Sequence, residues 1–176
     1  MADQPLTGIL LVGGASTRFG SPKALAVLDG QTLAEVGWET LAFCDERIAV
    51  GKAADVLDLP FPVLDDGIEV RAPIAGVVAG LRAAANDVCV VLPVDMPSVT
   101  PAVLLDLASA AADVATPQTG PLPGAYRRTA LPALETALAD GRLSLRDAVA
   151  GLDKLVVEVD RDLLVNVNTP DELDRI

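Results

Sequence analysis

The sequence predicts an α/β fold: a three-layer α/β/α sandwich around a mostly parallel sheet. Short apolar segments of strand length alternate along the 176 residues with amphipathic segments of helix length, which is typical of parallel sheets covered by helices. Residues 88–92 form a near-continuous apolar run, as expected for a central strand covered on both faces. Because 51% of the residues are hydrophobic, the chain can bury a substantial core, and we expect one domain over residues 1–176.

The predicted strands are apolar runs bounded by polar or glycine-containing loops. They cover residues 8–12, 47–50, 62–64, 87–94, 114–116 and 155–159, with a further extended segment at 122–126. In a sheet of this type, ligands bind beyond the carboxyl ends of the strands. We therefore expect the functional residues in the loops after Val12, Val50, Leu64 and Val94, and near Tyr126, which is as well suited to the core as to the site.

The predicted helices carry recognisable start signals. They cover residues 32–44, 73–85, 101–112, 131–139 and 144–150, and a short helix opens at Pro170. Thr32, followed by Glu35 three residues later, has the pattern of a capping box. Pro73 stands where proline is well tolerated, in the first helical turn.

Composition and charge exclude several classes of function. The net charge of −12 is divided evenly between the two halves of the chain, so we expect no nucleic-acid binding. The absence of histidine rules out mechanisms that need an imidazole. Cys44 and Cys89 lie in apolar segments without metal-type spacing, so both are expected to be buried free thiols. Neither a signal peptide nor a membrane span is recognisable, which predicts a cytoplasmic protein without membrane contact.

Residues 9–28 are the stretch around which the chemistry is expected to centre. An apolar strand there runs into a loop with Gly13-Gly14 and two cations, Arg18 and Lys23. Glycines let backbone N–H groups approach phosphate oxygens, and the cations neutralise them. The spacing fits neither the Walker pattern nor the dinucleotide fingerprint. An ordinary turn is the alternative, but it would not require this combination, so we interpret the loop as nucleotide-binding.

Two further loops carry carboxylates. Asp95 ends the buried strand between two prolines and is suited to Mg²⁺, which proteins usually bind through one or two carboxylates together with substrate phosphates; a turn aspartate is the alternative. Asp65 and Asp66 follow the strand at 62–64, where aspartates are common in a solvated acidic turn.

These motifs resemble those of the molybdenum cofactor guanylyltransferase family, nucleotidyltransferases with a Rossmann-like sheet of the nucleotide-diphospho-sugar transferase type. Near the N-terminus, the family's Leu-Ala-Gly-Gly, Arg-Met-Gly and Lys correspond to Leu11-Val12-Gly13-Gly14, Arg18-Phe19-Gly20 and Lys23. In the middle of the chain, its Gly-Pro-Leu-Ala-Gly and Asp-x-Pro correspond to Ala72-Pro73-Ile74-Ala75-Gly76 and Asp95-Met96-Pro97. Near the C-terminus, its Asn-x-Asn-Thr-Pro corresponds to Asn166-Val167-Asn168-Thr169-Pro170. The resemblance therefore extends along the whole chain. Pro22 departs from the family, which often has aspartate there.

The resemblance implies transfer of GMP from Mg-GTP to the phosphate of molybdopterin, giving the guanine dinucleotide and pyrophosphate. The implied catalytic residues are Arg18, Lys23 and Asp95, with Asp95 as the Mg²⁺ ligand. The implied nucleotide-binding residues are Leu11, Val12, Gly13, Gly14, Lys23, Gly51, Asp66 and Asp95. The resemblance implies that Asp66, before Asp65, contacts the nucleotide, and a carboxylate can accept both N–H donors of the guanine edge. GTP and molybdopterin are then the small-molecule substrates, and transient docking to molybdoenzymes or cofactor-carrier proteins is also implied.

The acceptor side of the site has weaker candidates. Asn166 and Asn168 are expected on one face of an apolar strand by the period of two, where their amides need partners from the backbone or from the second substrate. Candidates for the acceptor phosphate are Arg127, Arg128, Arg142 and Arg146.

Two alternatives stay open from the sequence. Pro22, Ala72 and Gly51 depart from the guanylyl pattern and leave room for a relative that uses CTP or a sugar-phosphate acceptor. A non-catalytic nucleotide-binding carrier subunit is an alternative of another class. The presence of both Lys23 and Asp95 argues against the carrier.

Overall fold

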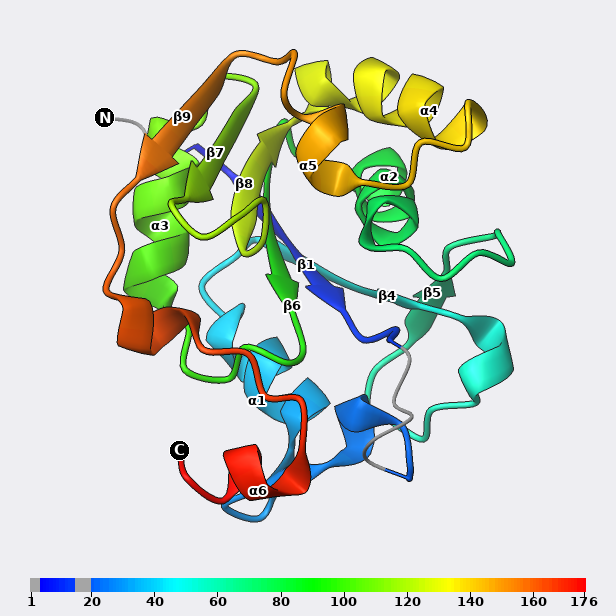
Figure 1. Cartoon of the computed structure of the whole chain (residues 1–176), viewed down its shortest axis with the longest axis vertical. Coiled ribbons are helices and arrows are strands. Elements are labelled where there is room, and N and C mark those ends of the chain that lie inside the picture. Colours follow the sequence, from blue (N-terminus) through cyan, green and yellow to red (C-terminus); the bar gives the residue numbers. More distant parts are fainter. Residues whose placement is uncertain (1–3, 15–19) are drawn as a thin grey trace.

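The fold is seen in a computed structural model that describes residues 4–14 and 20–176. These residues form a seven-stranded sheet in the order β5-β4-β1-β6-β8-β7-β9 (Figure 1). Its strands are β1 Leu6–Leu11, β4 Glu46–Gly51, β5 Val63–Asp65, β6 Val88–Pro93, β7 Val114–Pro117, β8 Gly124–Arg127 and β9 Lys154–Val157. Strand β8 runs antiparallel to both of its neighbours, and the other pairs are parallel. The mostly parallel sheet is therefore confirmed.

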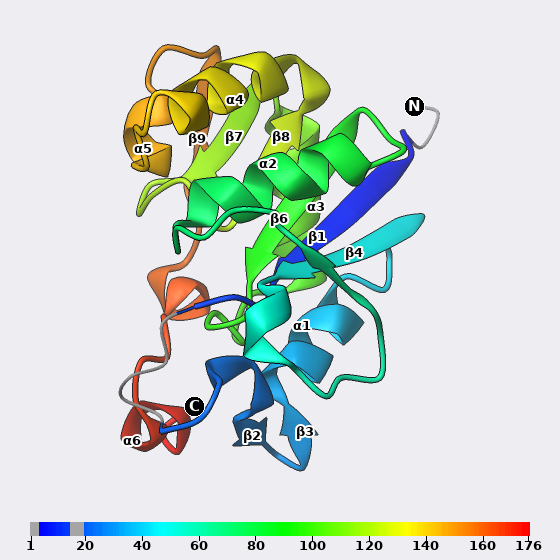
Figure 2. The same cartoon turned by 90° about the vertical axis from the view of Figure 1, so that its right-hand side faces the viewer.

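Helices cover both faces of the sheet. Their bounds are α1 Leu33–Thr40, α2 Pro73–Ala83, α3 Pro101–Ala110, α4 Leu131–Ala139, α5 Leu145–Ala148 and α6 Pro170–Leu173. Buried side chains of α1 and α3 pack in one apolar core, and those of α2, α4 and α5 in another. Figures 1 and 2 show these two groups on opposite sides of the strands, so the three layers are confirmed.

Strand β6, which contains the apolar run 88–92, is the middle strand of the sheet, as predicted. Helices approach its neighbour β1 closely from both faces. A Cβ atom built on Gly37 of α1 would lie 2.5 Å from Cδ1 of Leu10, and one on Gly80 of α2 would lie 2.7 Å from Cγ2 of Ile9. Both leucine and isoleucine are fully buried. Glycine at these two positions lets the helices pack directly on β1, which fixes the strand that leads into the glycine loop.

The local sequence signals explain where the elements begin. Thr32 caps α1: its hydroxyl accepts from the Glu35 amide, and the Glu35 carboxylate accepts from the Thr32 amide, so the capping box is confirmed. Pro73 lies in the first turn of α2. Helix ends differ from the prediction, since α1 stops at Thr40 and α5 has a single turn.

The prediction of secondary structure from the sequence failed in two places. The short hairpin of β2 Val27–Leu28 and β3 Gln31–Thr32 was not predicted. The prediction that Asn166 and Asn168 lie in a strand is wrong, because residues 165–168 form an extended segment outside the sheet. Its alternating sequence resembles a strand, but the Val167 amide donates to the carbonyl of Asp95 instead of to a sheet neighbour.

The two cysteines are free, as expected. Cys89 is buried, whereas Cys44 is only partly buried. Burial raises the pKa of each thiol to about 12, so both stay protonated and unreactive near neutral pH. Among the described residues, no helix has both the length and the apolar character needed to cross a membrane.

Candidate nucleotide site

A pocket of about 450 Å³ opens beyond the carboxyl ends of strands β1, β4, β5 and β6. Predicted site residues in its lining are Leu11, Val12, Gly13, Gly14, Lys23, Gly51, Asp66, Asp95 and Asn166. Side chains not predicted from the sequence also line it, among them Lys52, Arg71 and Leu122. The loops after these four strands therefore meet at one pocket. Arg18 lies outside the described residues, so its role stays a prediction.

The glycine loop lies against the end of β4. The Val12 amide donates to the Val50 carbonyl at 2.9 Å, which extends the pairing of the two strands. A Cβ atom on Gly51 would lie 3.0 Å from Cγ2 of Val12 and 3.2 Å from Cγ1 of Val63. There is little room for a side chain at Gly51, so any contact it makes with a ligand comes from its backbone.

Lys23 and Asp95 form one charged pair in the pocket lining, and Asp95 lies just after β6. Pro22, with φ of −54°, precedes the 3₁₀ turn Lys23–Leu25, and its carbonyl accepts from the Leu25 amide at 2.9 Å. The proline ring restricts φ to values near this one, so proline at position 22, where the family often has aspartate, is compatible with the turn that carries Lys23. Lys23 Nζ donates to Asp95 Oδ2 and to Asn168 Oδ1, both at 3.3 Å.

Asp95 is held through its backbone on both sides. The amide of the preceding residue, Val94, donates to the Leu11 carbonyl at 3.0 Å, and the Asp95 carbonyl accepts from the Val167 amide at 2.8 Å. This second bond brings Asn166 to the pocket and Asn168 to Lys23. Three segments that are distant in sequence therefore meet at Asp95.

The Asp95 carboxylate fits one role in a divalent metal site. Its side chain is 28% exposed and lies 3.3 Å from Lys23, so an oxygen can be offered to a ligand in the pocket. Within residues 4–14 and 20–176, no group of three or more acidic or cysteine side chains converges to hold a metal. A metal at Asp95 would therefore take its other ligands from substrate phosphates and water, which is the usual arrangement for Mg²⁺.

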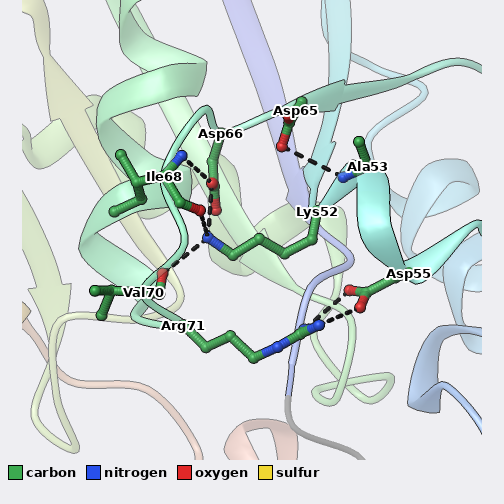
Figure 3. A network of polar contacts seen from close by, with 8 residues as sticks. All are labelled: Lys52, Ala53, Asp55, Asp65, Asp66, Ile68, Val70 and Arg71. Atoms are coloured by element: carbon green, nitrogen blue, oxygen red, sulfur yellow. Dashed lines mark hydrogen bonds and ion pairs between the residues drawn. The ribbon is translucent and has the colours of Figure 1, made fainter.

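The pocket lining contains a second pair, Lys52 and Asp66 (Figure 3). These residues follow β4 and β5, on the other side of β1 from Asp95, which follows β6, and we call these two sides the ends of the pocket. Lys52 Nζ donates to Asp66 Oδ1 at 2.7 Å, to the Ile68 carbonyl at 2.5 Å and to the Val70 carbonyl at 2.8 Å. Asp66 Oδ1 also accepts from the Ile68 amide at 3.1 Å. The two side chains are 9% and 7% exposed. This buried ion pair ties the end of β4 to the loop after β5.

A second, more exposed bridge joins the same two segments. Arg71 donates two hydrogen bonds to the carboxylate of Asp55, and these bonds raise the pKa of Arg71 further. Asp65 Oδ1 accepts from the Ala53 amide at 3.3 Å, outside the pocket. The structure thus places Asp66, and not Asp65, in the pocket lining.

Helix α2 begins at the same end of the pocket. Ala72 and Pro73 line the pocket, and Ala72 provides no side-chain hydrogen bond to the helix start. Pro73 has no N–H to offer, and the Ala75 amide donates to the Ala72 carbonyl at 3.1 Å. The partial positive charge of a helix start nevertheless lies beside the acidic Asp66.

The remaining candidates lie elsewhere. Tyr126 is fully buried and donates to the Pro121 carbonyl at 2.7 Å, so it belongs to the core. Arg127 pairs in register with Val88 at the amino end of β6 and forms an ion pair with Asp87, at the edge of the sheet opposite Asp95. In the described structure the pocket lining includes none of the candidate arginines, which are Arg127, Arg128, Arg142 and Arg146.

Comparison with known proteins gives a consistent result. Residues 8–157 match the family described as the MobA-like NTP transferase domain. The chain is 33% identical to a probable molybdenum cofactor guanylyltransferase of Deinococcus radiodurans, over 96% of this chain and 92% of that protein. It is 30% identical to a molybdenum cofactor guanylyltransferase of Desulfosudis oleivorans, over 97% and 93% of the two chains. The crystal structure of molybdopterin-guanine dinucleotide biosynthesis protein A from Archaeoglobus fulgidus is similar with a TM-score of 0.81, at 28% identity, covering 96% of this chain and 95% of that one.

Proposed function

The chain belongs to the MobA-like NTP transferase domain family, and on this premise we propose that it transfers GMP from GTP to the phosphate of molybdopterin. The products are the guanine dinucleotide form of the cofactor and pyrophosphate. Relatives at 30% and 33% identity over nearly the whole chain are named for this guanylyl transfer. The observation in this chain that supports the proposal best is the pocket with Lys23 and Asp95 at one end and Asp66 at the other.

The residues present suit the chemistry of nucleotidyl transfer. The acceptor phosphate is already an anionic nucleophile, so the reaction needs no histidine or serine. The enzyme has to align two phosphates and to neutralise the charge that shifts between them. An acidic protein of net charge −12 must provide this neutralisation locally, which the cations at the pocket do.

Each part of the pocket then has a role in the proposal. The amides of Gly13 and Gly14 and the Arg18 guanidinium bind the triphosphate. Lys23 neutralises the α-phosphate and the leaving pyrophosphate. Asp95 holds Mg²⁺, which when bound neutralises phosphate oxygens. Asp66 accepts from the guanine edge, while candidates for contact with the acceptor are Asn166 and Asn168.

The test is a screen of GTP, CTP, ATP and UTP for magnesium-dependent release of pyrophosphate in the presence of molybdopterin. We expect release with GTP, and none when molybdopterin or the metal is left out. A preference for CTP would instead indicate a cytidylyl transferase. Binding of nucleotide without release of pyrophosphate would indicate a carrier subunit, and either result would contradict the proposal.

A further inference from the structure

The Lys52 ammonium has no donor left for a ligand. An ammonium group offers three N–H donors, and Lys52 uses them on Asp66 Oδ1 and on the carbonyls of Ile68 and Val70. The side chain is only 9% exposed although it borders the pocket. A ligand could receive a hydrogen bond from Lys52 only if one of these three acceptors lost its own. Lys52 therefore serves to hold the Asp66 carboxylate and the Ile68 and Val70 carbonyls in place.

The group that it holds is the carboxylate of Asp66. Oδ1 accepts from both Lys52 and the Ile68 amide, whereas Oδ2 accepts no hydrogen bond from any residue that the structure describes. Asp66 lies in the pocket lining. One oxygen is thus anchored to the protein, and the other is available to a ligand at this end of the pocket.

We propose that Lys52 is a positioning residue for selection of the nucleobase. By fixing Oδ1 of Asp66, it presents Oδ2 to the N1–H and the 2-amino group of guanine. This inference rests on the proposed function. Adenine and cytosine carry a ring-nitrogen acceptor where guanine carries N1–H, so a fixed carboxylate oxygen opposes them. Lys52 selects guanine without touching it, through Asp66.

The loop after β5 depends on the same lysine. The Ile68 and Val70 carbonyls, both bound to Lys52, lie just before Arg71 and the start of α2 at Pro73. Without the ammonium these carbonyls and Asp66 lose their shared partner, and the loop is free to adopt other arrangements. The Arg71 bridge to Asp55 is 43% exposed on the arginine side, so it cannot replace the buried anchor.

The test compares the affinities for GTP and inosine triphosphate, which lacks the 2-amino group, measured by equilibrium binding without molybdopterin. We expect the wild-type protein to prefer GTP by about ten- to hundredfold, the effect of one hydrogen bond to a charged group. In Lys52→Met the preference should fall to about threefold or less. Lys154→Met, with the same chemical change on the exposed strand β9 at the far edge of the sheet, should keep the wild-type ratio.

A second variant keeps the test valid if Lys52→Met folds poorly. The double variant Lys52→Met/Asp66→Asn contains no unpaired buried carboxylate, and its folding is checked by circular dichroism. Its ratio of GTP to inosine triphosphate affinity should equal that of Asp66→Asn alone, because Lys52 acts through Asp66.

Three results from the variants would overturn the inference. They are a folded Lys52→Met protein with the wild-type ratio, an equal loss of affinity for both nucleotides, and a double variant that retains the preference for GTP. A wild-type protein without any preference for GTP would also overturn it. Failure of the proposed function is seen separately, as absence of pyrophosphate release by the wild-type protein with GTP and molybdopterin.

Discussion

The pocket has a lysine–carboxylate pair at each end, and the two pairs differ in construction. Lys23 and Asp95 are 3.3 Å apart and are 15% and 28% exposed. Lys52 and Asp66 are 2.7 Å apart and are 9% and 7% exposed, with two backbone carbonyls completing the lysine's contacts. Lys23 and Asp95 can each exchange the other for a ligand at a small cost in free energy. The second pair is a fixed part of the structure.

The difference in burial between the two ion pairs changes the free-energy cost of breaking each one. A partly exposed ion pair contributes about 0–1 kcal/mol to stability, so a phosphate or a metal can displace it easily. A buried pair is strongly unfavourable once one partner is removed, because the other charge is left unpaired. In the proposed function the exchangeable pair serves the reacting phosphates, and the fixed pair serves recognition of the base.

The largest expected effect is on stability, in Lys52→Met. Removing one partner of the buried pair should lower the free energy of unfolding by about 3–5 kcal/mol, measured by urea denaturation. Lys154→Met, on an exposed strand position, should stay within about 0.5 kcal/mol of the wild-type value. An equally small change in the free energy of unfolding of Lys52→Met would show that the Lys52–Asp66 pair contributes as little to stability as a partly exposed ion pair does.

The next effect is on activity, in Asp95→Asn. Loss of the carboxylate charge should lower kcat by about 100- to 1000-fold, the range seen when one group that stabilises developing charge is removed. The free energy of unfolding should change by less than about 1 kcal/mol, because the pair with Lys23 is partly exposed. Pyrophosphate release and urea denaturation measure the two quantities. Asp106→Asn, on the exposed side of α3, is the matched control, and full activity of Asp95→Asn would contradict the assignment.

The smallest effect is expected for Arg71→Gln. Its bridge to Asp55 joins the same segments as Lys52 and Asp66, but the arginine is 43% exposed. The free energy of unfolding should therefore fall by no more than about 1 kcal/mol in the same urea experiment. A loss as large as that of Lys52→Met would mean that burial does not distinguish the two bridges.

Most of the fold was predictable because its signals are local. The apolar run at 88–92, the capping box at Thr32 and the proline at the start of α2 each act within a few residues. The β2–β3 hairpin was missed since each strand has only two residues, too few to show a period. Residues 165–168 were misassigned because their alternation is strand-like, while the partner of Val167 is the carbonyl of Asp95.

The site was predictable where a side chain carries the signal. Gly13, Gly14, Lys23, Asp66 and Asp95 were all predicted, and all line one pocket. Lys52 was missed because two of its three acceptors are backbone carbonyls, which leave no trace in a sequence. Its position directly after Gly51, at the carboxyl end of a predicted strand, was the one available indication.

The most direct test of the division between the two ends is a crystal structure with GTP bound. We expect the guanine at the Lys52–Asp66 end, with N1 and the 2-amino nitrogen within hydrogen-bond distance of Asp66 Oδ2. The triphosphate should lie at the other end, with Lys23 moved from Asp95 to a phosphate oxygen and Lys52 still bound to its three acceptors. A guanine bound next to Lys23 and Asp95, or a Lys52 side chain released from Asp66, would contradict the account.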